Sequence, residues 1–266
     1  MSEAELTEYL SRPMTPPAGD VLKAIERGPV DPATALPLAD AARLLDPAPL
    51  EVETGWCWLP DGTGFVAVRT PMPAVTGEMV DWWFDWHPRA ADRYRIWHPQ
   101  AHYDNRVEPW TGPPRAKAHW GTVHHPAEDV GTGRVRARIE FAAPTEMGLP
   151  TDALDDPSVA TIVCGYAGDD TRRMRHTPMF HVFLREGDGV VLRSRFWLGA
   201  ALRPYLPAPL AAPLSAALNN GFVRRRALPK QLPKALARHC AEEYANLGAL
   251  LPELYARFGP RGSAPP

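Results

Sequence analysis

The stretch 235-ALARHCAEEYANLGALLPELYARF-258 has the apolar periodicity of a long helix near the end of the chain. Six of its side chains recur at intervals of three or four residues, which places them on one helix face: Leu236, His239, Glu243, Leu247, Leu250 and Leu254. Because the leucines favour the core, His239 and Glu243 are expected to point inward with them. A buried ionised carboxylate must be paired, protonated or bound to a metal. This helix is therefore expected to place an imidazole and a carboxyl group in the core against which it packs.

Two interpretations of the His239 and Glu243 pair are open from the helix alone. A neutral imidazole hydrogen-bonded to the carboxyl one turn away is the more economical one. The alternative is the helical half of a metal site, since a His and a Glu four residues apart often bind a metal together. The cysteines, Cys57, Cys164 and Cys240, are widely separated, so a cysteine-ligated site is not expected. Zinc or another borderline divalent ion would need two further ligands from elsewhere.

The composition excludes several classes of protein. The chain has 266 residues, 45% of them hydrophobic and 23% charged, as in ordinary globular proteins. A net charge of −2 argues against nucleic-acid binding, which needs a basic surplus. The start of the chain has no apolar signal-peptide core, and no apolar run reaches the roughly 18 residues of a membrane span. We therefore expect a cytoplasmic protein without membrane or nucleic-acid partners.

The order of predicted elements indicates the fold class. A hairpin turning at Asp61-Gly62 precedes a helix over 76–88, which has Thr76 as its N-cap, and a short helix that Pro99 ends. Antiparallel strands follow, with a hairpin at 187–190, and then a Pro- and Ala-rich connection leads to the final helix. This order predicts an α+β helix-grip fold, in which a curved antiparallel sheet surrounds a long C-terminal helix. Residues 1–50, rich in proline, are expected to form a mainly helical extension, and residues 51–266 the helix-grip domain.

Other histidines offer candidate ligands and catalytic groups. His102 lies close in sequence to Tyr94 and Asn105, whereas His181 sits at an inward-facing strand position in MFHVF. Glu128 is expected in a loop before Gly131. The remaining histidines favour structural roles: His87 as a helix cap, His98 as a hydrogen-bonding group before a proline, and His119, His124 and His125 at surface or edge positions.

Several segments, in order, together resemble one known family. They are GWCWLPDGTGFVAVRTPMPAVTGEMVDWWFDWH, YRIWHPQAHYDN, RIEFAAPTEMG, RSRFWLG and HCAEE. They are similar to the zinc-dependent C–C hydrolases of the diacetylphloroglucinol hydrolase and phloretin hydrolase family, from about residue 50 onward. The resemblance implies a helix-grip domain of the birch-pollen-allergen type, assembled as a homodimer.

The resemblance also implies a set of site residues. One Zn²⁺ per chain would be held by His102, Glu128, His239 and Glu243, with Asp129 and Glu140 as alternatives to Glu128. Tyr94 and Asn105 would contact the substrate oxygens, and His181 would transfer a proton. The sequence departs from the family where Arg134 falls near an acidic position and where Phe196 or Trp197 replaces a tyrosine.

The predicted function is therefore the metal-dependent hydrolysis of a hydroxyaryl ketone, a retro-Claisen-type cleavage of the bond between an acyl group and a polyhydroxylated ring. The product pair would be a phenol and a carboxylic acid. Two alternatives stay open: a non-catalytic carrier of hydrophobic ligands, and a cyclase-like protein that uses the same cavity without a metal. The carrier would need no metal and would keep His239 and Glu243 as a buried hydrogen-bonded pair.

Overall fold

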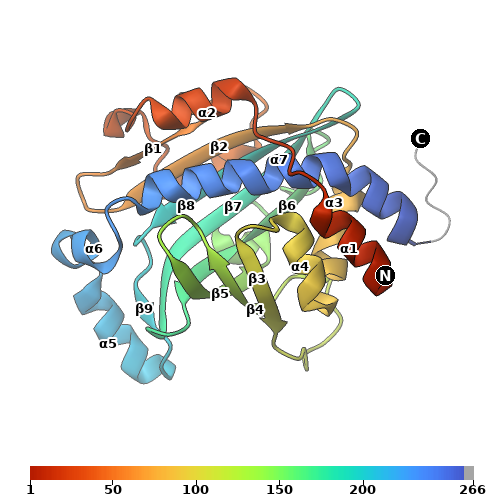
Figure 1. Cartoon of the computed structure of the whole chain (residues 1–266). Coiled ribbons are helices and arrows are strands. Elements are labelled where there is room, and N and C mark those ends of the chain that lie inside the picture. Colours follow the sequence, from red (N-terminus) through yellow and green to blue (C-terminus); the bar gives the residue numbers. More distant parts are fainter. Residues whose placement is uncertain (261–266) are drawn as a thin grey trace.

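The computed structural model describes residues 1–260 of the chain. Within them, nine strands form one antiparallel sheet in the order β1-β2-β8-β7-β6-β5-β4-β3, with β9 paired to β7. The sheet curves around helix α7 (Leu232–Phe258), which runs across its concave face (Figure 1). The predicted helix-grip fold is thus confirmed.

The other elements have the following bounds. The strands are β1 Gly55–Trp58, β2 Gly64–Met72, β3 His102–Val107, β4 Val123–Asp129, β5 Arg134–Ala142, β6 Val159–Asp169, β7 Met174–Glu186, β8 Gly189–Leu198 and β9 Arg203–Pro204. The helices before α7 are α1 Glu3–Ser11, α2 Gly19–Glu26, α3 Gly77–Trp86, α4 Ala91–Trp97, α5 Ala208–Leu218 and α6 Gly221–Ala227.

Local sequence signals account for several of these boundaries. The Thr76 hydroxyl accepts a hydrogen bond from the Met79 N–H and caps α3, as predicted. Gly62 has a φ of 84° in the turn between β1 and β2, a left-handed conformation that glycine adopts without strain. Gly187, with a φ of 58°, serves the hairpin between β7 and β8 in the same way.

The loop predicted around Glu128 and Asp129 is wrong, because both residues belong to β4. They pair with Val135 and Arg134 of β5, so the ladder continues to the turn. At the turn, the Asp129 Oδ1 accepts the backbone N–H groups of Gly131, Thr132 and Gly133 at 2.8–3.1 Å. The carboxylate closes the hairpin and lets the strand run to its last residue.

The sheet is covered on both faces, and the N-terminal segment supplies part of the cover. In β2, Val66 and Val68 pack with the α7 side, whereas Phe65 and Ala67 pack on the opposite side with Leu44. Helix α2 instead lies along α7 and α1 packs against α4 (Figure 1), and the Tyr9 hydroxyl of α1 donates to Glu253 of α7 at 2.8 Å. The division of the chain at residue 50 stays a prediction, but residues 1–50 pack closely on the rest.

Two buried arginines of β8 tie the segment before β1 to the convex face of the sheet. Arg193 donates to the Ala48 carbonyl and to Glu53, both at 2.8 Å. Arg195 donates to the Val52 carbonyl at 2.8 Å and lies 3.5 Å from Glu53. Glu53 therefore compensates two guanidinium groups that are almost fully buried.

Replacing Glu53 with glutamine should lower the free energy of unfolding by about 3 kcal/mol, because two buried cations lose their shared counter-charge. The lower end of the usual range is expected, since 23% of the Glu53 side chain is exposed. Urea unfolding followed by fluorescence measures the change, with Glu51→Gln at an exposed position as the matched control. A loss below about 0.5 kcal/mol, as for an ordinary surface substitution, would show that the arginines do not depend on Glu53.

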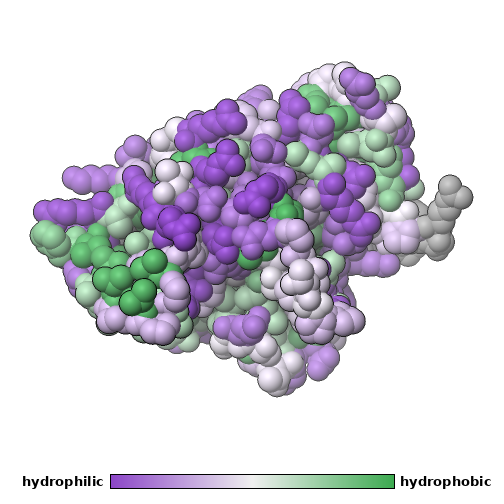
Figure 2. Space-filling view, turned by 90° about the horizontal axis from the view of Figure 1, so that it is seen from below, coloured by the Kyte–Doolittle hydropathy of each residue, from purple (hydrophilic) through white to green (hydrophobic). Residues whose placement is uncertain are grey.

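The surface carries one notable group of apolar side chains over α5, α6 and the residues just before α5. It consists of Leu206, Leu210, Leu214 and Phe222, each more than 40% exposed. Figure 2 shows apolar residues gathered in this part of the molecule.

No helix within residues 1–260 combines the length and the apolar character that crossing a bilayer requires.

Candidate functional site

A cavity of about 300 Å³ lies between α7 and the sheet. Its wall combines apolar side chains with groups that carry chemistry. The polar and ionisable members that matter below are His87, Tyr94, Asn105, His124, Glu128, His181, His239, Glu243 and Tyr244. A mostly apolar cavity with a few convergent polar groups is the usual form of a small-molecule site.

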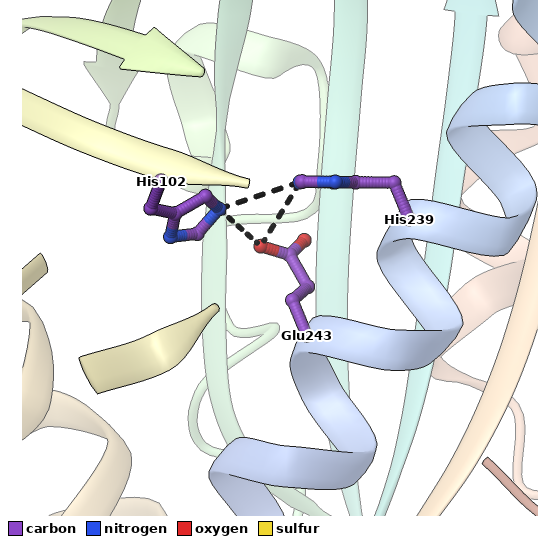
Figure 3. A group of neighbouring side chains, drawn as sticks. All are labelled: His102, His239 and Glu243. Atoms are coloured by element: carbon purple, nitrogen blue, oxygen red, sulfur yellow. Dashed lines mark hydrogen bonds and ion pairs between the residues drawn. The ribbon is translucent and has the colours of Figure 1, made fainter. Parts of the chain in front are cut away.

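Three side chains converge in Figure 3: His102 from the first position of β3, and the cavity-lining His239 and Glu243 from adjacent turns of α7. The His102 Nε2 lies 3.3 Å from the His239 Nε2 and 3.5 Å from the Glu243 Oε2. The His239 Nε2 and the Glu243 Oε2 are 3.7 Å apart. Ligands bonded at about 2.1 Å in a tetrahedral site are separated by about 3.4 Å. The three distances match that spacing.

Glu128 stands beside this group. Its Oε2 lies 3.8 Å from the His102 Nε2 and accepts a short hydrogen bond from the Tyr94 hydroxyl. The two alternatives to Glu128 lie elsewhere: Asp129 closes the β4–β5 turn, and Glu140 pairs with Arg138. Of the candidate carboxylates, Glu128 is therefore the one placed beside the histidines.

The protonation states suit a cation. Burial lowers the pKa of His102 well below its ordinary value, and it lowers the pKa of His239 to about 3, so both imidazoles are neutral. Burial raises the pKa of Glu243 well above its ordinary value, with Glu128 as a second cause, and burial also raises the pKa of Glu128. A divalent cation favours the ionised carboxylates. Neutral imidazoles with carboxylates form a donor set suited to zinc.

Neighbouring groups orient the two histidines. The His102 Nδ1 donates to the Tyr94 carbonyl at 3.1 Å, which leaves the lone pair of Nε2 facing the cluster. The Tyr94 ring also stacks on the His102 ring, with centroids 4.0 Å apart. On the helix side, the ring of His98 stacks on His239 at 5.0 Å, and its Nε2 lies 3.5 Å from Glu242.

The structure also brings the predicted catalytic residues to the cavity. Asn105 lines it from β3, and its buried Oδ1 has no hydrogen-bond partner within residues 1–260. His181 lines it from β7, with Nδ1 2.9 Å from the Ser194 hydroxyl and its ring against Tyr244. Burial lowers the pKa of His181 to about 3, so its imidazole is neutral.

The two positions of departure from the family have different surroundings. Phe196 lines the cavity, whereas Trp197 points to the opposite face of the sheet, where its Nε1 donates to the Leu36 carbonyl at 2.9 Å. Arg134 is exposed and lies over the Tyr103 ring, away from the cavity. Of the two positions where the sequence is expected to depart from the family, Phe196 therefore lies on the cavity wall and Arg134 does not.

The sequence prediction of surface or edge positions for His124 and His125 is wrong, because both are buried. Strand β4 is covered on both faces: His124 faces the cavity, whereas His125 lies between Glu108 at 2.9 Å and Asp170 at 3.0 Å. His119 is buried too, against Phe84. The period of two along β4, which puts His124 on the side of Glu128, was the signal available in the sequence.

His87 ends α3 as predicted, but it does more than cap the helix. Its ring stacks on Trp83 with centroids 5.0 Å apart, and it lines the cavity. Tyr244, one residue after Glu243, also lines the cavity and was not considered from the sequence. Tyr244 was missed because it lies one residue, about 100° around the helix, from the stripe that contains Glu243.

Comparison with known proteins identifies relatives over nearly the whole chain. The profile of the DAPG hydrolase PhiG domain matches residues 36–256. Phloretin hydrolase from Eubacterium ramulus is 30% identical over 94% of this chain and 88% of its own. The 2,4-diacetylphloroglucinol hydrolase of Pseudomonas protegens is 31% identical over 95% of this chain and 84% of its own.

Solved structures with a similar arrangement are far more distant. Ara h 8.0201 is 12% identical with a TM-score of 0.35, covering 68% of this chain and 98% of that one. Norcoclaurine synthase from Thalictrum flavum is 11% identical with a TM-score of 0.33, covering 64% of this chain and 91% of that one. These similarities do not inform on the site.

Proposed function

This chain belongs to the DAPG hydrolase family, and on that basis we propose that it hydrolyses the carbon–carbon bond between an acyl group and a polyhydroxylated aromatic ring. The names of its relatives, phloretin hydrolase and 2,4-diacetylphloroglucinol hydrolase, point to hydroxyaryl ketones as the substrate class. The proposed metal is Zn²⁺, held by His102, Glu128, His239 and Glu243.

The observation that carries the proposal is the convergence of two neutral histidines and two carboxylates at the end of an apolar cavity. A carrier of hydrophobic ligands has no need of such a group, because two neighbouring buried carboxyls stay ionised only when a cation lies beside them. The non-catalytic and cyclase-like alternatives are therefore disfavoured.

The proposed reaction adds water to the acyl carbon, breaks its bond to the ring carbon and leaves a proton on that ring carbon. The products are a carboxylic acid and a phenol. Zinc, when bound, supplies Lewis acidity for this chemistry. Tyr94 and Asn105 are proposed to orient the substrate oxygens. The Asn105 Oδ1 has no hydrogen-bond partner among residues 1–260, and the Tyr94 hydroxyl donates to Glu128 beside the cluster.

His181 is the proposed proton carrier. An aryl carbanion is a poor leaving group, but a hydroxylated ring can take the proton at carbon as its keto tautomer before the bond breaks. In the proposed mechanism, the free ring nitrogen of the neutral His181 accepts a proton from a ring hydroxyl and returns it to the ring carbon. Its hydrogen bond to Ser194 holds the ring in place for this transfer.

Incubation of the purified, zinc-loaded protein with 2,4,6-trihydroxyphenyl ketones tests the reaction. We expect one equivalent each of carboxylic acid and trihydroxybenzene per ketone consumed, measured by liquid chromatography. Binding of the ketone without release of acid would support the carrier instead.

The homodimer and the cytoplasmic location stay predictions. Light scattering of the purified protein tests whether it is a dimer.

Replacing Tyr94 with phenylalanine removes the hydroxyl that holds Glu128 but keeps the ring that stacks on His102. We expect kcat to fall about 10- to 100-fold, the usual cost of losing a group that orients a metal ligand. The matched control is Tyr103→Phe, at an exposed position next to His102. A kcat within twofold of the wild type would show that catalysis does not depend on the Tyr94 hydroxyl.

A further inference from the structure

Two histidines that the proposed mechanism does not use lie together along the cavity. His87 and His124 both line it, and their ring centroids are 6.1 Å apart. Both are almost completely buried, with 2% and 3% of their surface exposed. Buried polar groups without a partner are uncommon, so each ring nitrogen is expected to form a hydrogen bond with the protein or with a ligand.

The hydrogen bonds of His87 fix its tautomer. Its Nδ1 lies 2.8 Å from the Trp83 carbonyl, which can only accept, so Nδ1 carries the proton. In a neutral imidazole the other nitrogen is then an acceptor. Burial lowers the pKa of His87 to about 3, which keeps the ring neutral. Within residues 1–260, the Nε2 has no hydrogen-bond partner in the protein.

His124 has the opposite tautomer. The Thr122 hydroxyl donates its single hydrogen to the His119 carbonyl at 2.6 Å, so it must accept from the His124 Nε2, which lies 3.2 Å away. The His124 Nδ1 is therefore the unprotonated nitrogen, and it too has no protein partner among the residues that the structure describes. Burial holds the pKa of His124 well below its ordinary value.

The position of this pair relative to the metal cluster suits one aromatic ring. His124, Pro126 and Glu128 face the cavity from alternate positions of β4, so the Cα atoms of His124 and Glu128 are about 13 Å apart. The aromatic side chains of Phe84 and Phe141 flank the histidine pair. A ring whose ketone lies at Glu128 would extend its far side toward two hydrogen-bond acceptors.

We propose that His87 Nε2 and His124 Nδ1 form an acceptor pair that binds two ring hydroxyls of the substrate, one at each nitrogen, and that the pair sets the requirement for a polyhydroxylated ring. This inference rests on the proposed function for the orientation of the ligand. The pair recognises donors, so it selects phenols over their methyl ethers. It leaves the metal cluster to act on the ketone.

The tautomers dictate which substitutions preserve the acceptor. Glutamine reaches the position of Nε2, and asparagine that of Nδ1. His87→Gln and His124→Asn should therefore keep the preference for the hydroxylated ligand within about threefold. The crossed variants, His87→Asn and His124→Gln, should lose about tenfold of it, the worth of one neutral hydrogen bond. At each position, the glutamine and asparagine variants are matched controls for each other, because they differ only in how far the amide reaches.

The preference is measured in two ways. The first is the ratio of kcat/KM for a 2,4,6-trihydroxyphenyl ketone to that for its 4-O-methyl ether. The second is calorimetric binding of 1,3,5-trihydroxybenzene against 1,3,5-trimethoxybenzene, which needs no turnover. Loss of the preference in the crossed variants alone, at unchanged metal content, supports the acceptor pair.

Equal binding of the two benzenes by the wild type, or equal preferences in all four variants, would overturn the inference. If the wild type cleaves no ketone, the proposed function is contradicted instead. The comparison of binding by the two benzenes still tests whether His87 and His124 act as hydrogen-bond acceptors. A merely structural role for the histidines would weaken both ligands alike. The two failures are therefore distinguishable.

Discussion

Replacing His239 with alanine should abolish metal binding and reduce kcat/KM by about 1000-fold or more. Its Nε2 lies 3.3 Å from the His102 Nε2 and 3.7 Å from Glu243, so it is central to the cluster. Loss of a Lewis acid removes several kcal/mol of transition-state stabilisation, and each 1.36 kcal/mol is a factor of ten in rate. Zinc per chain, measured by mass spectrometry, should fall from near one to near zero.

The matched control is Lys234→Ala, five residues earlier on α7, where the side chain is 41% exposed and forms a surface ion pair with Glu26. It should keep both metal and activity, because such ion pairs contribute little. A His239→Ala variant that is folded, metal-free and as active as the wild type would refute the role of the cluster.

Replacing His181 with glutamine should reduce kcat by about 100- to 10,000-fold, the usual contribution of a general acid–base group. Glutamine keeps a polar side chain beside Ser194 but cannot carry a proton at neutral pH. KM should change far less than kcat, since the substrate contacts of Tyr94 and Asn105 remain. Single-turnover kinetics with a trihydroxyphenyl ketone measure the chemical step directly.

Metal content separates this variant from the previous one. His181 lies on β7, outside the cluster, so His181→Gln should retain the zinc of the wild type. Ser194→Ala is the milder companion, because it removes only the hydrogen bond at 2.9 Å that holds the ring. An unaltered kcat in His181→Gln would assign the proton transfer to another group.

The fold could be predicted largely from local signals. The i, i+3, i+4 pattern over 235–258 is a helix in the structure, and Thr76 and Gly62 occupy the cap and turn positions that their chemistry favours. The burial of residues 1–50 could not be predicted in this way. Leu44 packs on the face of the sheet opposite α7. This contact joins residues far apart in the sequence, and composition and periodicity do not predict such contacts.

The candidate site shows the same division. His239 and Glu243 were accessible from helical periodicity, whereas the position of His102 beside them depends on the turn after α4, where its N–H donates to the His98 carbonyl at 2.8 Å. The roles of His87 and His124 depend on tautomers, which follow from hydrogen-bond partners across the cavity wall. Those partners are visible only in three dimensions.

Crystals of the active wild-type enzyme, measured by X-ray diffraction just above and just below the zinc absorption edge, give the most direct test of the metal site. The account predicts an anomalous peak, present only above the edge, within about 2.2 Å of the His102 and His239 Nε2 atoms and of one oxygen each of Glu128 and Glu243. An active enzyme whose crystals show no such peak, or show it elsewhere, would contradict the account.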